Sequence, residues 1–361
     1  MRLLYADTLT AYPLNVAGGH RCSHLMRRLL CERRGASCLA LVPHGALGAP
    51  PAPEYYPRLP DFAALGIRSF RQEPGRWTFD CGYPVEVVDE LWEALDDAFE
   101  RFRPDVFVTL SLEPERFFER ARAHGVPAVW DIMDVRYAPE KVRAAADSGV
   151  RILALSHFMA RWLREQAGVE ASVVYPLLPR EDYQVEPDRR GLITVINLFP
   201  EKGFDTFVET ARRLPQERFL AVESWPLGAR LPEVRARLAE LPHVEFQPRL
   251  ADARDVYRRT RLLLVPSRYL ESAGRVVVEA HWSGIPVIVS RRGGLPEMLG
   301  DGGLVVDSDD PDEWARAVRA VSEDPALYAR LSQAARRNAE RPDFDPEIIL
   351  DSFLRAVGHG P

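Results

Sequence analysis

The sequence predicts an α/β protein with two Rossmann-like domains, each built on a doubly wound parallel sheet. Short apolar runs alternate with amphipathic helical segments along most of the chain, which is the pattern of parallel strands joined by helices. The 361 residues exceed one ordinary core and suit two domains of about 150–180 residues each. A segment rich in proline and charge, Tyr175–Arg190, separates two such series and predicts an interdomain linker.

Charge and cysteine content restrict the function. A net charge of −6 without a surplus of Lys and Arg argues against nucleic acid as the main partner. The four cysteines show no metal-ligand spacing, so we expect reduced thiols in a cytoplasmic protein. No apolar run approaches the roughly 20 residues of a membrane span, and neither export nor a membrane span is predicted.

The first domain begins with a predicted strand over Arg2–Ala6. After a loop containing Gly18 and Gly19, a helix is predicted over His20–Arg34. This helix carries five arginines against one glutamate, so it could lie on an anionic membrane surface. A solvated basic face, with the apolar residues of the helix packed inward, is the favoured alternative.

The remaining elements of the first domain alternate regularly. A strand at Ser37–Val42 precedes a surface loop rich in Pro and Gly at Pro43–Pro60. The later elements are predicted as strand Ile67–Phe70, helix Pro84–Phe102, strand Val106–Leu110, helix Pro114–His124, strand Ala128–Ile132, helix Pro139–Ser148, strand Ile152–Leu155, helix His157–Gln166 and strand Ser172–Val174.

A second series follows the linker. Its elements are predicted as strand Ile193–Ile196, helix Phe204–Leu214, strand Phe219–Val222, helix Leu231–Leu241, strand Val244–Gln247, helix Asp252–Thr260, strand Leu262–Val265, a helix from about Gly274, strands Val287–Ser290 and Leu304–Val306, and helices Pro311–Ser322, Pro325–Glu340 and Pro346–Val357. We therefore expect an N-terminal domain over residues 1–180 and a C-terminal domain over 190–344.

The candidate site centres on Glu271 and Glu279, which have seven residues between them. They bracket a loop at the carboxyl end of a predicted strand, where open α/β sheets bind ligands. A helix starting near Gly274 would offer an anion the amides from Ala273 to Val277, those of Arg275 and Val276 among them. Phosphates at these amides, ribose hydroxyls at Glu279 and a sugar at Glu271 would match a nucleotide diphosphate sugar. The alternative is that Glu279 pairs with Arg275 at i,i+4 on a solvated face.

Lys202 is a second candidate. It directly precedes Gly203 and a predicted helix, and an ammonium group at a helix N-terminus is unfavourable for the helix dipole. An anion bound between them would remove this conflict.

The stretch around the two glutamates resembles the E-x7-E signature of retaining glycosyltransferases with the GT-B fold, as in glycosyltransferase family 4. Pro266-Ser267 before it and Glu279-Ala280-His281-Trp282-Ser283-Gly284-Ile285-Pro286 at its end follow the family pattern. The resemblance implies that Glu279 holds the ribose, Glu271 contacts the transferred sugar and Lys202 binds the diphosphate. The two domains would then face a central cleft.

The resemblance also implies further donor contacts. Gly18 and Gly19 match a Gly-Gly loop that closes over the donor, and Arg249 lies in a turn that packs on the nucleotide base. Ile196-Asn197 stands where the family has Gly-Arg, so one positive charge is lost. Asn197 could still donate a hydrogen bond, and Arg268 or Arg275 could replace the charge. Glu297, in a Gly-Gly-x-Pro-Glu loop, is expected to cap the turn that follows it.

Acceptor contacts are predicted in the first domain. Family members usually carry a His-Asp pair where this chain has Met133-Asp134, so the histidine is missing. Acceptor contacts then fall to His20, Asp131 or Asp134, although a lone Asp is often only a turn or capping residue. As in GT-B proteins, residues 345–361 are expected to cross back onto the first domain.

The predicted activity is that of a retaining glycosyltransferase, of the hexosyltransferase type, using a UDP- or GDP-linked sugar by a front-face mechanism. No cofactor and no metal are expected, because Lys202, Arg275 and backbone amides can stabilise the departing diphosphate. The acceptor, whether a small molecule, a lipid-linked one or a saccharide, is left open. Alternatives are a sugar-nucleotide epimerase or a phosphorylase of the same fold, or a sugar-nucleotide-binding subunit without catalysis.

Overall fold

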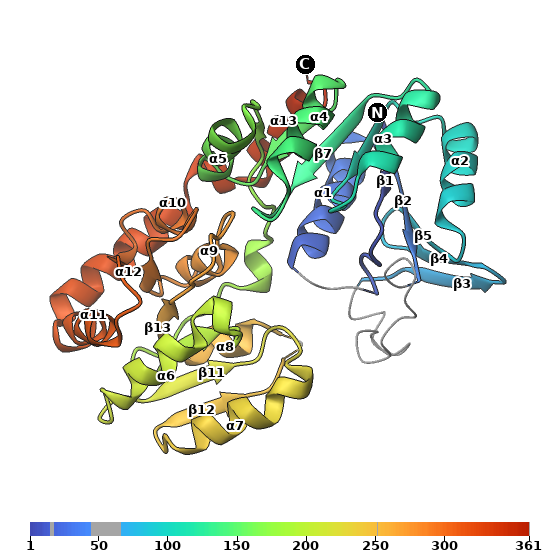
Figure 1. Cartoon of the computed structure of the whole chain (residues 1–361). Coiled ribbons are helices and arrows are strands. Elements are labelled where there is room, and N and C mark those ends of the chain that lie inside the picture. Colours follow the sequence, from blue (N-terminus) through green and yellow to red (C-terminus); the bar gives the residue numbers. More distant parts are fainter. Residues whose placement is uncertain (15–17, 45–65, 251, 361) are drawn as a thin grey trace. The chain divides into compact units, whose positions relative to one another are not determined.

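The computed structural model describes residues 1–14, 18–44, 66–250 and 252–360. The chain forms two compact units (Figure 1). The first unit comprises Met1–Leu155, Ala160–Leu177 and Pro346–Pro361, and the second comprises Ser156–Met159 and Leu178–Asp345. Most of the surface loop predicted at Pro43–Pro60 lies outside the described residues.

The sheet of the first unit has the order β3-β4-β5-β2-β1-β6-β7-β8-β9. Its strands are β1 (Arg2–Ala6), β2 (Ser37–Pro43), β3 (Ser69–Glu73), β4 (Arg76–Asp80), β5 (Pro84–Val88), β6 (Val106–Thr109), β7 (Ala128–Ile132), β8 (Arg151–Ala154) and β9 (Ser172–Val173). From β5 to β9 all pairs are parallel, as predicted.

One edge of this sheet differs from the prediction. β4 pairs antiparallel with both β3 and β5, and Pro84–Val88 is a strand rather than the start of a long helix. Val85 and Val87 are fully buried in β5, because alternating valines pack well on a pleated sheet surface. The predicted helix is therefore shorter and begins only at Leu91.

Helices cover the strands of the first unit. They are α1 (Gly18–Arg34), α2 (Leu91–Phe102), α3 (Glu115–Ala123), α4 (Pro139–Asp147), α5 (His157–Ala167), whose first three residues belong to the second unit, and α13 (Pro346–Ala356). Figure 1 shows α1 and α2 on opposite sides of the strands, as right-handed crossovers in opposite directions require. α1 includes Gly18 and Gly19, which were predicted to lie in the preceding loop.

The basic helix α1 is neutralised within its own unit. Arg33 and Arg34 pair with Glu347 at 2.6 and 2.7 Å, and Arg34 also pairs with Asp351 at 2.8 Å. Both carboxylates lie on α13, which thereby packs against α1. Arg27 is buried. These contacts support the solvated face over a membrane-binding one, and none of the described helices is long and apolar enough to cross a membrane.

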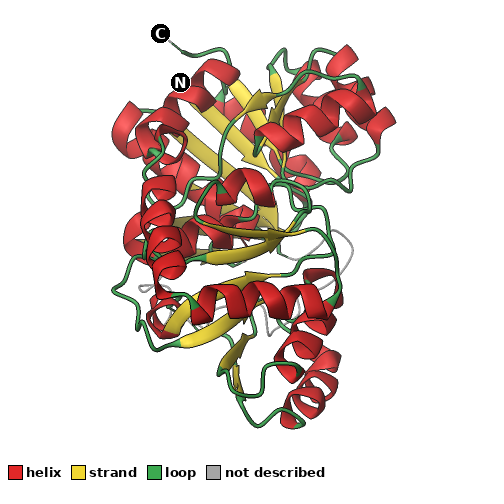
Figure 2. Cartoon of the chain, turned by 90° about the vertical axis from the view of Figure 1, so that its left-hand side faces the viewer, coloured by secondary structure: helices red, strands yellow, loops and turns green. Residues whose placement is uncertain are grey.

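The sheet of the second unit is entirely parallel, with the order β12-β11-β10-β13-β14-β15. Its strands are β10 (Leu192–Ile196), β11 (Phe219–Val222), β12 (Val244–Gln247), β13 (Thr260–Val265), β14 (Val287–Ser290) and β15 (Gly303–Val306). The doubly wound α/β prediction is confirmed for both units, and Figure 2 shows their strands covered by helices.

The core of the second unit lies between its sheet and helices. The helices are α6 (Phe204–Arg212), α7 (Leu231–Ala239), α8 (Arg254–Arg259), α9 (Arg275–His281), α10 (Leu295–Leu299), α11 (Pro311–Glu323) and α12 (Pro325–Ala339). Phe207, Phe219 and Trp314 are nearly or fully buried in one apolar cluster. This cluster fixes the strands, and their carboxyl ends then position the loops that carry the candidate residues.

Candidate functional site

The strand order of the second unit reverses between β10 and β13. Because these neighbouring strands are parallel, their following loops emerge side by side at the carboxyl edge, the usual ligand site of such sheets. Lys202 lies in the loop after β10 and Glu271 in the loop after β13. The topology thus brings together two residues that are 69 positions apart in the sequence.

Lys202 and Glu271 form a direct ion pair. The distance from Lys202 Nζ to Glu271 Oε1 is 2.7 Å, and their side chains are only 17% and 15% exposed. Ser267 Oγ also donates to the same carboxylate oxygen at 2.7 Å. A lysine has three donors, so Lys202 can keep this contact and still donate to a second anion.

Gly203 holds the two loops together by backbone contact. It has φ of 85°, a conformation that costs little only for glycine. A Cβ atom there would lie 1.8 Å from the carbonyl oxygen of Pro266. The amides of Arg268 and Tyr269 donate to the carbonyl of Glu201 at 2.9 and 3.1 Å.

A second glycine, Gly293, packs against Glu271. Its φ is 64°, and a Cβ atom there would lie 2.1 Å from the carbonyl oxygen of Glu271. The amide of Gly294 donates to that carbonyl at 2.7 Å. The Gly-Gly sequence noted in this loop is therefore explained by close packing on the backbone of Glu271.

Glu279 is buried in α9 and is held by two partners. Tyr257 donates its hydroxyl to Oε2 at 2.7 Å, and Arg275 donates to Oε1 at 3.1 Å. Burial, followed by the charge of Glu279, raises the pKa of Tyr257 well above its ordinary value, so the phenol remains a donor. The predicted i,i+4 pair exists, but Glu279 is only 6% exposed, so the pair does not lie on a solvated face.

The start of α9 agrees with the prediction. Gly274 precedes the helix with φ of 87°, and Ala273 is buried. The helix spans only Arg275–His281, and so short a helix has a small macrodipole. Positive charge at this edge therefore comes chiefly from side chains, with Val276 and its neighbours contributing amides.

Asn197 occupies a left-handed position at the end of β10, with φ of 82°. Asn is among the residues that tolerate this conformation best. Its Oδ1 accepts a hydrogen bond from the amide of Phe199 at 3.2 Å. The two arginines considered as replacements for the missing family arginine both have carboxylate partners: Arg275 pairs with Glu279, and Arg268 pairs with Asp309 at 3.3 Å.

The aromatic surroundings of Lys202 were not predicted. Its Nζ lies 5.2 Å from the ring centre of Trp225 and 5.4 Å from that of Tyr269, within cation–π range. Trp225 follows β11, the other neighbour of β10. No motif marks this tryptophan, but a large aromatic residue shortly after a strand at a sheet's ligand edge was a usable signal.

Glu297 has partners that were not predicted. Its carboxylate accepts hydrogen bonds from the amides of His157 and Phe158 at 2.9 and 2.7 Å. Beside them, Ser156 Oγ donates to the carbonyl of Ser272 at 2.5 Å. These contacts within the second unit fix the loop that follows Glu271.

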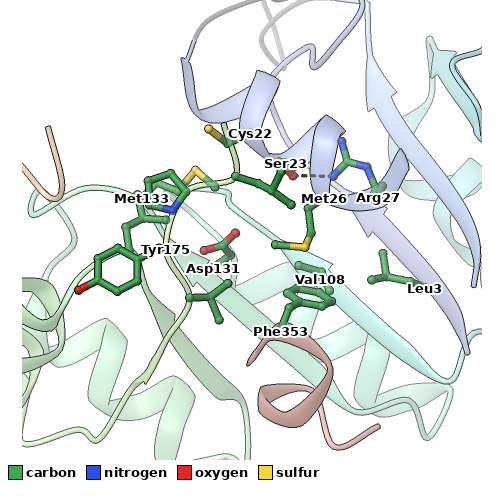
Figure 3. A pocket seen from close by; sticks show the side chains of 14 residues that line it. Leu3, Cys22, Ser23, Met26, Arg27, Val108, Asp131, Met133, Tyr175 and Phe353 are labelled. Carbon is green, nitrogen blue, oxygen red and sulfur yellow. Dashed lines mark hydrogen bonds between the residues drawn. The ribbon is translucent and has the colours of Figure 1, made fainter. Parts of the chain in front are cut away.

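The acceptor candidates lie in the first unit. Asp131 lines a small cavity of about 30 Å³ together with Ser23, Arg27 and Met133 (Figure 3). Burial raises the pKa of Asp131 to about 7, against the lowering effect of the Arg27 charge. The carboxyl therefore titrates near neutral pH and can either donate or accept a hydrogen bond.

His20 and Asp134 differ from Asp131. Burial lowers the pKa of His20 to about 4, so the imidazole is neutral at physiological pH. Asp134 pairs with Arg136 at 2.7 Å and accepts its amide at 3.0 Å, which is the turn role considered from the sequence. A Cβ atom on Gly19 would lie 3.0 Å from Met133 Sδ, so these residues of α1 and the β7 loop pack closely.

The positions of the other predicted donor residues say little about donor binding. Arg249 is exposed in the turn after β12, and Gly18 is the first residue of α1 in the first unit. Their contacts to a donor stay predictions.

Comparison with known proteins agrees with this arrangement. Residues 179–338 match the family described as glycosyl transferases group 1. A D-inositol 3-phosphate glycosyltransferase of Streptomyces avermitilis is 40% identical over 114 residues, which cover 30% of this chain and 24% of the relative. A protein of the same description from Mycobacterium marinum is 32% identical over 188 residues, covering 48% of this chain and 40% of the relative. The matched regions thus span less than half of these relatives.

Solved structures match over almost the whole chain. The Anabaena protein HepE, in complex with UDP, has a TM-score of 0.77 at 18% identity and covers 99% of both chains. Sucrose-phosphate synthase from Thermosynechococcus elongatus has a TM-score of 0.77 at 15% identity and covers 98% of both chains. At these identities the likeness shows the fold, so the predicted GT-B fold is confirmed.

Proposed function

We propose that the chain is a retaining glycosyltransferase, of the hexosyltransferase type, that uses a nucleotide diphosphate sugar, because residues 179–338 match the family described as glycosyl transferases group 1. The observation that carries this proposal is the partly buried Lys202–Glu271 pair at the carboxyl edge of the second sheet, with Glu279 held in α9 by Tyr257 and Arg275. Two fixed carboxylates and an ammonium group with spare donors suit a ligand that has a diphosphate between two sets of hydroxyls.

Each residue has a distinct role. Lys202 donates to the diphosphate and neutralises the charge that develops on it as the sugar leaves. Glu271 accepts hydrogen bonds from hydroxyls of the transferred sugar, and Glu279 accepts them from the ribose. The amides of Ala273, Gly274, Arg275 and Val276 add neutral donors to the phosphates.

The proposed reaction proceeds on one face of the sugar. The bond between the anomeric carbon and the diphosphate oxygen breaks while an acceptor hydroxyl forms the new bond from the same side. The hydroxyl proton passes to the departing phosphate oxygen, so atoms and charge balance without a protein base. This route needs no imidazole at the Met133 position and no metal.

The donor and the acceptor are assigned to different units of the chain. We assign the donor to the second unit and the acceptor to the first, where Asp131 lines a cavity. UDP- and GDP-linked sugars are the donors to test first; HepE has been solved with UDP and with UDP-glucose. D-inositol 3-phosphate, which appears in the names of the similar proteins, is one acceptor to test. A cytoplasmic location, expected from the cysteines, stays a prediction.

A thermal-shift panel of UDP, UDP-glucose, GDP and GDP-mannose tests donor binding, because a ligand far above its dissociation constant stabilises by about 3–4 kcal/mol. Lys202→Ala should weaken binding of the stabilising nucleotide about 10-fold or more, since it removes a charged hydrogen bond. Lys141→Ala is the matched control, because Lys141 also pairs with a glutamate, at 2.8 Å, but with 43% of its side chain exposed. Equal binding by both variants would refute the role of Lys202.

Product analysis separates the alternatives. Transfer to an acceptor with the donor's anomeric configuration, read by nuclear magnetic resonance, supports the proposal. A changed sugar nucleotide without acceptor indicates an epimerase, and sugar release on adding phosphate indicates a phosphorylase. Donor binding without turnover for every acceptor tested indicates a binding subunit.

A further inference from the structure

Trp225 is an exposed aromatic side chain at the same sheet edge as the proposed donor site. It follows β11 and is 44% exposed. Among the large apolar side chains that are exposed in the described ranges, it is the one aromatic. An exposed indole leaves apolar surface in contact with water, and a ligand could cover this surface. The exposure of Trp225 therefore needs an explanation.

The ring lies close to the Lys202–Glu271 pair. Lys202 Nζ is 5.2 Å from the centre of the Trp225 ring and 2.7 Å from Glu271 Oε1. These two distances place the ring centre within about 8 Å of the Glu271 carboxylate, roughly the width of one hexose and its contacts. The partners of Glu279, by contrast, come from α8 and α9.

The Trp225 ring packs against Phe199, and the residue lies within a closed turn of the backbone. Phe199 meets it edge-on, with ring centres 5.8 Å apart and an angle of 60°, a favourable aromatic geometry. The next residue is Pro226, which restricts the backbone. Glu223 Oε1 accepts the amide of Leu227 at 2.9 Å and closes the turn around the tryptophan.

We propose that Trp225 is a specificity-determining residue on which the ring of the transferred sugar stacks, an inference that rests on the proposed glycosyltransferase function. A pyranose has an apolar face of C–H groups that is complementary to the negative face of an aromatic ring. Glu271 binds hydroxyls, and Trp225 binds this apolar face. Because the ring is near Glu271, it contacts the sugar rather than the base.

Calorimetric titration of the parent chain, Trp225→Ala and Trp225→Phe tests this proposal. Each protein is titrated separately with a nucleoside diphosphate and with its sugar nucleotide, either UDP and UDP-glucose or GDP and GDP-mannose. The pair used is the one that stabilises the parent chain. Trp225→Ala should bind the sugar nucleotide about 10-fold more weakly and the nucleoside diphosphate within about twofold of the parent, because only the sugar loses its platform. Trp225→Phe should recover part of the loss.

Leu112→Ala is the control, since Leu112 is 45% exposed in the first unit, and it should change neither affinity. An equal loss of both ligands in Trp225→Ala would overturn the proposal and indicate a platform for the nucleotide. No loss of either would also overturn it. A parent chain that binds neither pair would instead refute the proposed function itself. Equal unfolding temperatures of parent and variants show that the fold is unchanged.

Discussion

Gly203→Ala should be unusually destabilising, because Gly203 joins the two loops that carry Lys202 and Glu271. Its φ is 85°, and a Cβ atom would lie 1.8 Å from the carbonyl oxygen of Pro266. This neighbour is backbone, so it cannot rotate away as a side chain could. The loop after β13 must therefore shift by more than 1 Å to reach an ordinary contact of about 3.4 Å.

Alanine substitutions at two other glycines measure the cost of the backbone strain without this clash. Gly149 has φ of 89° and Gly228 has φ of 53°, and a Cβ atom at either would meet nothing within 4 Å. Alanine at these two positions should cost about 1–2 kcal/mol, the strain of a left-handed residue. Gly203→Ala adds overpacking of about 1–3 kcal/mol, for a total of about 2–5 kcal/mol.

Urea unfolding of the three variants and the parent measures these differences. Gly149→Ala has nearly the same φ as Gly203→Ala, and Gly228→Ala lies in the same unit. We expect Gly203→Ala to be at least about 1 kcal/mol less stable than either control. If its free energy of unfolding matched theirs, the contact with Pro266 would have no energetic weight and the argument would fail.

Three further predictions concern single side chains. The chain has only two lysines, so acetylation read by mass spectrometry should show bound sugar nucleotide protecting Lys202 but not Lys141; equal labelling with and without nucleotide would contradict the donor site. Burial raises the pKa of Asp131 to about 7, above the unfolded value of about 3.9, so the folded state binds the proton more tightly and loses stability as the pH rises from about 4 to 7. Asp131→Asn removes this loss, and its advantage in urea unfolding should grow by up to about 1.4 kcal/mol per pH unit in that range; a constant difference would refute the assignment. Phe353→Ala in α13 should cost about 3–5 kcal/mol because the ring is 3% exposed, whereas Arg33→Ala, which breaks a pair of 45% and 48% exposed side chains, should cost less than about 1 kcal/mol.

The strands that could be predicted are those whose own residues show that the strand is buried. In the second unit, Phe219–Val222 and Val287–Ser290 are fully buried strands with the predicted bounds, because strands covered on both faces are continuous apolar runs. Pro84–Val88 was missed because Glu86 interrupts its apolar run. That glutamate is buried by an ion pair with Arg101 at 2.6 Å, a contact from α2 that no local pattern reveals.

The edge strand β3 could not be predicted at its full length for a related reason. Its residues are largely exposed, so there is little apolar periodicity, and its structure comes from antiparallel pairing with β4. Such pairing is made by backbone hydrogen bonds to the neighbouring strand, which the sequence of β3 alone does not reveal.

The candidate site shows the same contrast between residues that a local motif reveals and residues whose contacts lie far away in the sequence. Glu271, Glu279 and Lys202 could be selected from the sequence because they lie in motifs, and the resemblance supplied roles for them. Two partners of Glu297 lie 139 and 140 positions away, so no local pattern could predict them. The aromatic ring next to Lys202 was overlooked because no motif contains it.

The backbone packing around Gly203 and Gly293 has a practical consequence for engineering. The charged side chains project from loops that main-chain contacts lock in place, so the shape of those loops depends little on which functional groups they display. Residues of these loops, such as Tyr269 after β13, can therefore be randomised in a directed-evolution library with few unfolded members. Altered sugar preference should be reachable by changing side chains at this edge, provided that both glycines are retained.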